Sequence, residues 1–350
     1  MSAICEQRAG SVDAMRGFVM FFIIGLGSLL WHVGYLTDSP YWQEQMIHAK
    51  WEGLHLYDQI FPLFVYISGI SMSFSLKKTS SKGHTLLRLW RRALVLIMLG
   101  WLVNGPIVWD LQQMRYASVL GLIGLSGALA GSLVLFVRNT WGQFVCILLL
   151  LVGIAAAQYW GGDMTPTGCV NAYIDSRYCP GQLYKKYYDP EGPLCILSAT
   201  ALNLLGYLSG SLFGSIPGAP KRLTIWLTAG TLLICAALPL PVIKNIWTPG
   251  FVLVTAGIGA ILLALFHLLC DVWKLPVWSD PMQAVGRNAL FIYIVTAATG
   301  FSDFNVRLFA GTLRLILPSA YVSPALSATH LLLAWGICYF LHRRKLYIRV

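Results

Sequence analysis

Residues 248–270 read TPGFVLVTAGIGAILLALFHLLC, a run without any aspartate, glutamate, lysine or arginine. A helix that crosses the hydrocarbon core of a bilayer needs about 20 consecutive, mostly apolar residues. Only helices and closed barrels satisfy every backbone hydrogen bond in lipid, and apolar runs of this length are typical of helices. The stretch therefore predicts a membrane-spanning helix.

Runs of the same kind recur along the whole chain. Hydrophobic residues make up 57% of the sequence and charged residues only 11%, whereas soluble domains have about 25% charged residues. We therefore predict an all-α fold, a polytopic membrane helix bundle of about ten transmembrane helices formed by a single domain over residues 1–350. The ten predicted spans are 15–36, 57–76, 87–103, 117–137, 142–160, 194–214, 223–240, 248–270, 283–300 and 324–341.

Two apolar segments need a separate interpretation. The stretch 305–318 is expected to form a re-entrant or surface helix rather than an eleventh span. The first apolar run has no small-residue cleavage site, so we do not expect it to be a cleaved signal peptide.

The net charge of +11 is distributed unevenly over the loops. With the N-terminus inside, the inner face holds 17 of the 25 basic residues and the outer face holds 10 of the 14 acidic ones. This is the positive-inside pattern of membrane proteins, so the charge does not indicate a nucleic-acid partner. It predicts cytoplasmic termini and a cytoplasmic loop at 77–86, with the loops 37–56 and 161–193 outside. The basic residues assigned to the inside are Arg8, Arg16, Lys77, Lys78, Lys82, Arg88, Arg91, Arg92, Arg138, Lys221, Arg222, Lys274, Arg287, Arg343, Arg344, Lys345 and Arg349.

The chain has eight cysteines. Cys169 and Cys179 share the long outer loop, where an oxidising compartment favours a disulfide between them. The other six, Cys5 among them, are expected to be ordinary free thiols in helices or on the inner side. No cysteine or histidine spacing matches a zinc site, so no metal is expected.

Residues 48–62 read HAKWEGLHLYDQIFP and combine a histidine with a carboxylate at the edge of a predicted span. An imidazole titrates near neutral pH, which suits acid–base chemistry. A carboxylate at a membrane boundary is functional by default. The alternative interpretation is a solvated loop histidine, His48, and an aspartate, Asp58, favoured by the dipole at a helix N-terminus.

Five stretches carry a family resemblance. They are SVDAMRG at 11–17, the stretch 48–62 with Gly69, DPEG at 189–192, WTPGFVLVTAG at 247–257 and, more weakly, GRNAL at 286–290. Together, in this order, they resemble the heparan-α-glucosaminide N-acetyltransferase family of transmembrane acyltransferases. The compact form, without an outer N-terminal domain, is similar to the bacterial members.

The resemblance implies a function. Members of the family take an acetyl group from cytosolic acetyl-CoA and deliver it across the membrane to a sugar amine, and their active-site histidine falls on His48. We therefore expect acetyl-CoA as co-substrate, an amino sugar such as glucosamine or a glycan end as acceptor, a bacterial inner-membrane location surrounded by lipid, and a homodimer.

Transfer of an acetyl group to an amine needs a base for the amine proton and a stabiliser for the oxyanion. His48 is the candidate base, or it accepts the acetyl group itself. Asp58 either orients the His48 ring or binds the acceptor ammonium. His55, three residues before Asp58, can share a helix face with it if the helix begins that early. It is a candidate for the acceptor site.

Candidate donor-site residues lie at inner helix ends. Arg91 and Arg92 are able to bind phosphates of CoA through their guanidinium groups, or they are topology anchors. Arg16 either faces a CoA phosphate or pairs with Asp13 at i,i+3 spacing. Asn288 either holds the pantetheine or thioester or bridges two helices.

On the outer side, Asp189 and Glu191 suit a cationic amino sugar, or they are solvated loop charges. Two family features are absent, namely an asparagine late in the first span and a glutamine–arginine pair where the chain reads Gly121-Leu122. These departures favour a rival interpretation, a transporter for a sugar or its derivative on a degenerate acyltransferase frame. A second rival is O-acetylation of a surface polysaccharide.

Overall fold

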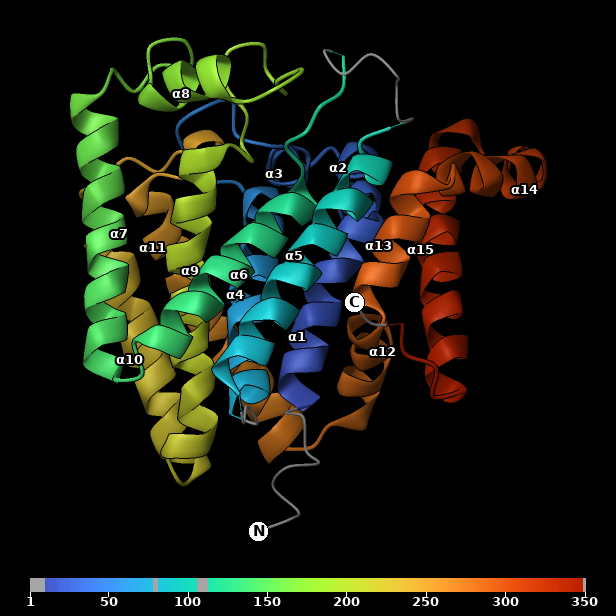
Figure 1. Cartoon of the computed structure of the whole chain (residues 1–350). Helices are drawn as coiled ribbons and strands as arrows, with labels where there is room; N and C mark the ends of the chain where they lie inside the picture. The colour runs from blue at the N-terminus through green and yellow to red at the C-terminus, as the bar shows by residue number, and fades with distance from the viewer. Residues whose placement is uncertain (1–9, 78–80, 106–112, 349–350) are drawn as a thin grey trace. The chain divides into compact units, whose positions relative to one another are not determined.

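The computed structural model describes residues 10–77, 81–105 and 113–348, which form helices joined by loops (Figure 1). Within these residues there is no β-strand, only three isolated bridges. The predicted all-α fold is therefore confirmed. Cys5, Arg8, Lys78 and Arg349 lie outside the described residues.

The chain divides into two compact units by its own packing. Of the described residues, the first unit comprises 10–49, 55–61 and 265–348, and the second comprises 50–54, 62–77, 81–105 and 113–264. Each is described separately below. The expectation of a single transmembrane domain stays a prediction.

The first unit contains the N-terminal and C-terminal helices. Its first long helix is interrupted at Phe22–Leu26 by a π-helical turn, in which Gly25 has a φ of 144° that is accessible to glycine but strained for other residues. The helices of this unit are α1 (Gly10–Phe21), η1 (Phe22–Leu26), α2 (Gly27–Leu36), α3 (Pro40–Gln45), the start of α4 (Leu56–Leu76), η3 (His267–Val272), α12 (Pro276–Arg287), α13 (Ala289–Ala298), α14 (Phe301–Ile316) and α15 (Ser319–Arg343).

Two of the family-like stretches meet at the crossing of α1 and α12. A Cβ atom added to Gly17 would collide with the backbone carbonyl of Met282, and one added to Gly286 would collide with that of Asp13. The two backbones therefore approach as closely as glycine allows. The stretches SVDAMRG and GRNAL thus each supply one glycine, Gly17 and Gly286, to this close contact.

The predicted span 283–300 is interrupted. α12 ends at Arg287, and Asn288 has non-helical dihedral angles (φ −117°, ψ 25°) before α13 begins. α13 and α14 are bent by 72° to each other (Figure 1). A helix at 305–318 was predicted to be re-entrant or to lie at the surface. α14 (Phe301–Ile316) covers most of that stretch, and its placement as a re-entrant or surface helix stays a prediction.

The second unit is built from the middle of the chain. Its helices are the rest of α4, α5 (Lys82–Val103), α6 (Val119–Phe136), α7 (Thr140–Trp160), α8 (Val170–Tyr178), α9 (Pro193–Ser215), α10 (Ala219–Ala237), η2 (Lys244–Ile246) and α11 (Pro249–Phe266). The short helix α8 lies across one end of α7 and α9, and it was not predicted (Figure 1).

Residues 50–54 and the WTPG stretch have structural roles within the second unit. Trp51 donates its indole N–H to the Met164 carbonyl at 2.6 Å, and the N–H of Gly53 bonds to the Val242 carbonyl at 2.9 Å. The Thr248 hydroxyl accepts the backbone N–H of Ile243 at 3.0 Å and donates to the Pro241 carbonyl at 2.8 Å. These bonds anchor the loop that precedes α11.

The helices confirm a multi-pass membrane protein. Every predicted span overlaps a helix. Among the described residues, seven helices are long and apolar enough to cross a membrane, or eight if the bent pair α13 and α14 counts as one span. The prediction of about ten spans is thus roughly met. α5, which carries Arg88, Arg91 and Arg92, and α10 are not among the seven.

The predicted disulfide is wrong. Cys169 and Cys179 are both free thiols, and they lie at opposite ends of α8 as its N-cap and C-cap. A helix rises about 1.5 Å per residue, which separates them by roughly 15 Å, whereas the Cα atoms of a disulfide lie less than about 7 Å apart. The helix that the sequence analysis missed is the reason.

Candidate active site

The candidate active site is organised by the carboxylate of Asp58, in the first turn of α4. Its Oδ1 accepts the ring Nδ1–H of His48 at 2.8 Å, and its Oδ2 accepts the backbone N–H groups of Ala49 and His55, each at 3.1 Å. The Asp58 side chain is 1% exposed and that of His48 is 51% exposed. A buried carboxylate therefore holds a half-exposed imidazole in one orientation.

The same bond decides the state of the His48 ring. A carboxylate oxygen only accepts hydrogen bonds, so Nδ1 carries the proton and donates it. In the neutral imidazole the lone pair then lies on Nε2. This is the arrangement in which a histidine is able to take a proton or attack an acyl group.

Tyr57 is a neighbour of His48 that the sequence analysis missed. The two ring centroids are 5.0 Å apart, with the planes tilted by 40°. A Cβ atom at Gly27 would lie 2.7 Å from Cε2 of Tyr57. The ring of Tyr57 therefore packs directly against Gly27 and occupies the space that a side chain would fill there. Gly27 directly follows the π-helical turn, which links the kink of the first span to the surroundings of His48.

His55 does not lie on α4, because the helix begins one residue later. The backbone of His55 bonds to Asp58, while its ring Nδ1 donates to the Ile47 carbonyl at 3.0 Å and its Nε2 lies 3.8 Å from Glu44. The condition for a shared helix face of His55 and Asp58, a helix that begins at or before His55, is therefore not met. The ring of His55 instead fastens the loop that carries His48.

Asp13 forms a second cluster in the first unit. Arg16 donates to its Oδ1 at 3.0 Å and Arg287 donates to its Oδ2 at 3.3 Å. Arg16 also reaches the Gly286 carbonyl at 3.4 Å. The pairing of Asp13 with Arg16 is confirmed, and the cluster carries a net positive charge.

Asn288 is fully buried and uses both ends of its amide. Its Nδ2 donates to the Leu346 carbonyl at 3.2 Å, and its Oδ1 accepts the N–H of Ile348 at 3.0 Å. Asn288 therefore fixes the segment after α15. The other two expected donor-site residues, Arg91 and Arg92, are exposed on α5 in the second unit.

A neighbouring network on the same unit was also missed. The Ser11 hydroxyl donates to Oδ2 of Asp271 at 2.6 Å, and Nδ1 of the buried His267 lies 2.8 Å from the same oxygen. The i,i+4 spacing of His267 and Asp271 would have indicated this pair from the sequence, because residues four apart on a helix lie on the same face.

The second unit contains an ion-pair cluster around Arg115. Arg115 binds both carboxylate oxygens of Asp189, at 2.7 and 2.8 Å, and also pairs with Glu191. Asp189 is fully buried and its backbone N–H donates to Asp175 at 2.9 Å. The interpretation of Asp189 and Glu191 as solvated loop charges is therefore wrong. Arg115 was missed because its partners lie more than 70 residues away in the chain.

Burial and charge shift the pKa values in this cluster. Burial raises the pKa of Asp175 to about 7, with a contribution from the negative charge of Asp189. Burial also raises the pKa of Glu191. For Asp189, burial is outweighed by the hydrogen bonds and positive charge of Arg115 together with a hydrogen bond involving Glu191, so its pKa is lowered. The cluster therefore distributes protons unevenly among three carboxyl groups.

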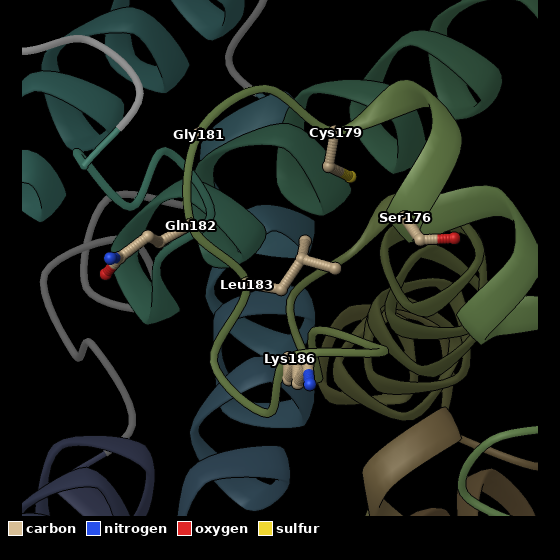
Figure 2. A pocket seen from close by; sticks show the side chains of 6 residues that line it. All are labelled: Ser176, Cys179, Gly181, Gln182, Leu183 and Lys186. Carbon is tan, nitrogen blue, oxygen red and sulfur yellow. The ribbon is translucent and has the colours of Figure 1, made fainter.

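A cavity of about 440 Å³ opens beside this region (Figure 2). Its lining comes from the end of α8 and the segment that follows: Ser176, Cys179, Gly181, Gln182, Leu183 and Lys186. None of the predicted site residues lines it. Within the described parts of the chain, no group of three or more histidine, cysteine or acidic residues is placed to hold a metal ion.

The fold and these sites define a multi-pass membrane protein with a histidine–aspartate pair at the end of a helix. Residues 8–173, which include that pair, match the sequence family described as heparan-alpha-glucosaminide N-acetyltransferase, catalytic. The family resemblance found in the motifs is confirmed, and the chain is related to these acetyltransferases.

Two curated relatives bear the same name. The human heparan-alpha-glucosaminide N-acetyltransferase is 25% identical over 361 aligned positions, which cover 82% of this chain and 52% of the human protein. The mouse protein is 23% identical, with 82% of this chain and 53% of the relative covered. The chain thus spans about half the length of the curated relatives it matches.

Proposed function

We propose that this protein is a transmembrane acetyltransferase that moves an acetyl group from acetyl-CoA to the amine of an amino sugar or glycan end. The observation that carries the proposal is the 2.8 Å bond between Nδ1 of His48 and the buried Asp58. The relationship to named N-acetyltransferases supports the same chemistry.

In the proposed reaction, Nε2 of His48 takes a proton from the acceptor amine while the amine nitrogen attacks the acetyl carbonyl carbon. The new C–N bond forms as the C–S bond of the thioester breaks, and the proton passes from the imidazolium to the CoA thiolate. Asp58 stabilises the imidazolium, in the role that a carboxylate has beside the histidine of a hydrolase triad. If His48 is instead acetylated first, the same lone pair forms the C–N bond of an acetyl-imidazole.

The donor is proposed to enter from the cytoplasm and the acceptor from the periplasm of a bacterial inner membrane, with both chain ends cytoplasmic. The split of basic residues supports this sidedness. In the first unit, Arg16 is proposed to attract a CoA phosphate, and Asn288 to support it through the chain segment that Asn288 binds. In the second unit, Arg91 and Arg92 are proposed to attract CoA phosphates. His55, Asp189 and Glu191 are proposed for the acceptor side, where they act through the loops they hold. A homodimer within the lipid is part of the proposal.

The test is acetyl transfer from radiolabelled acetyl-CoA to glucosamine by the purified protein in lipid vesicles. We expect His48→Ala to abolish transfer, while CoA still binds, because a half-exposed side chain contributes little to the fold. The matched control is His84→Ala, at an exposed position on α5. Full activity of His48→Ala contradicts the mechanism. Sugar uptake into vesicles without acetylation by the wild-type protein would identify the transporter instead, and acetate esters in the product would identify O-acetylation.

A further inference from the structure

Gln59, the residue after Asp58 in α4, has an unusual environment. Its side chain is buried, with 5% of the residue exposed. Neither its Oε1 nor its Nε2 has a hydrogen-bond partner among the described residues. Other buried amides of the described chain, such as those of Asn203 and Gln158, keep at least one hydrogen bond.

An amide without partners is unfavourable inside a protein, because it has lost its bonds to water and gained none. The loss is not compensated in the hydrocarbon region of a membrane. Polar side chains within membrane helices mark the paths of ligands and ions. A leucine of similar size would avoid the free-energy cost of a buried amide without hydrogen bonds. The glutamine at this position therefore indicates a polar group of a ligand that binds there only part of the time.

The position of Gln59 relates it to the candidate active site. Successive residues of a helix are 1.5 Å apart along its axis. Gln59 therefore lies in the same helical turn as Asp58, whose carboxylate holds His48. Consecutive side chains of a helix point about 100° apart around its axis, so a ligand group at Gln59 lies at the level of Asp58 along α4 but on an adjacent side of the helix.

We propose that Gln59 binds a secondary amide of a substrate, with Nε2 donating to the amide carbonyl and Oε1 accepting the amide N–H. An amide offers one donor and one acceptor, and it therefore satisfies both orphaned atoms at once. The inference rests on the proposed acetyltransferase function, in which two molecules carry such a group. These are the pantetheine arm of CoA and the N-acetylated product.

The test uses Gln59→Leu in the purified full-length protein. We expect the dissociation constant of CoA to rise about tenfold, the scale of one or two hydrogen bonds. The dissociation constant of 3′,5′-ADP, which has the phosphates but no pantetheine arm, should stay unchanged. If the product is the ligand, binding of N-acetylglucosamine weakens and that of glucosamine does not.

Thermal unfolding of the ligand-free protein is the second measurement. Gln59→Leu should unfold at the same or a higher temperature, because it removes an amide that has no partner. The matched control is Gln143→Leu on α7, which loses a bond of 3.0 Å to the Val137 carbonyl. It should lower the unfolding temperature and leave ligand binding unchanged.

Two results overturn the inference about Gln59. One is an unchanged affinity of Gln59→Leu for both CoA and N-acetylglucosamine while the wild-type protein binds CoA. The other is a lower unfolding temperature of ligand-free Gln59→Leu, which would reveal an internal partner. A wild-type protein that binds neither CoA nor N-acetylglucosamine contradicts the proposed function itself. The wild-type binding measurement alone distinguishes this result from the other two.

Discussion

Asp58 illustrates how a single carboxylate organises the candidate active site. One oxygen holds the ring of His48 and the other holds two backbone N–H groups of the preceding loop. The side chain therefore positions both the imidazole and the chain segment that carries it. We therefore expect a change at Asp58 to act on the proposed reaction through His48.

Asp58→Asn keeps the size of the side chain and removes its charge. We expect the rate of acetyl transfer to fall about 100-fold or more, because an amide does not stabilise the imidazolium and permits the wrong tautomer. The measurement is kcat in vesicles with acetyl-CoA and glucosamine. Asp38→Asn, at an exposed loop position with positive φ that asparagine tolerates, is the control. An unchanged kcat for Asp58→Asn would show that Asp58 has no part in positioning the histidine.

Asp175 predicts a pH dependence of stability. Burial raises the pKa of Asp175 to about 7, above the ordinary value of 3.8. Between about pH 4 and 7 the folded protein therefore binds more protons than the unfolded chain, so the free energy of unfolding falls as the pH rises through this window. Asp175→Asn removes the carboxyl group that binds this proton. Its oxygen is still able to accept the N–H of Asp189.

The unfolding temperatures of wild-type protein and Asp175→Asn in detergent, at pH 5 and pH 8, test this prediction. The wild-type protein should lose more of its stability on going to pH 8 than the variant does. An equal loss in both proteins would mean that Asp175 is ionised in the fold throughout this range.

The residues His48 and Asp58 were found in the sequence because a histidine and a carboxylate are conspicuous in an apolar chain. Tyr57 and Arg115 were not found. An aromatic ring next to a membrane helix and an arginine in a loop are both common. Only the residues that they contact in the fold distinguish Tyr57 and Arg115 from the other tyrosines and arginines of the chain.

At the scale of elements, a chain of contacts joins the kink of the first span to the candidate active site. The π-helical turn with Gly25 is followed by Gly27, and the missing side chain of Gly27 leaves room for the ring of Tyr57. Tyr57 in turn lies against His48. Helix geometry in one segment thus sets the position of a ring in another.

Gly27→Ala should reduce acetyl transfer by about 10- to 100-fold, because a displacement of about 1 Å in a catalytic group has effects of this size. The added Cβ would lie 2.7 Å from Tyr57, which has to move. Gly336→Ala on α15 is the control, since no atom lies within 4 Å of its added Cβ. Transfer rates of both variants, with circular dichroism to verify folding, are the measurement. Normal activity of Gly27→Ala would show that Tyr57 does not affect His48.

At the scale of the whole molecule, the basic residues predict the orientation in the membrane. Single cysteines introduced at Ser39 and Ser81, in a background without the native cysteines, should react with a membrane-impermeant reagent from opposite sides. The expected result is labelling at position 39 in intact spheroplasts and at position 81 only after the membrane is opened. Labelling of both from the same side would contradict the proposed topology.

The sequence by itself determined the class of fold, because apolar runs of about 20 residues have few alternatives to a membrane helix. It also located the stretch that contains His48 and Asp58. Only the tertiary structure decided that α8 separates Cys169 from Cys179, that Asp189 and Glu191 belong to Arg115, and that Asn288 ends a helix rather than lying inside a span. Hydrophobic length is a local property of the chain, whereas ion pairs, kinks and close helix crossings depend on residues that are distant in sequence and meet only in the fold.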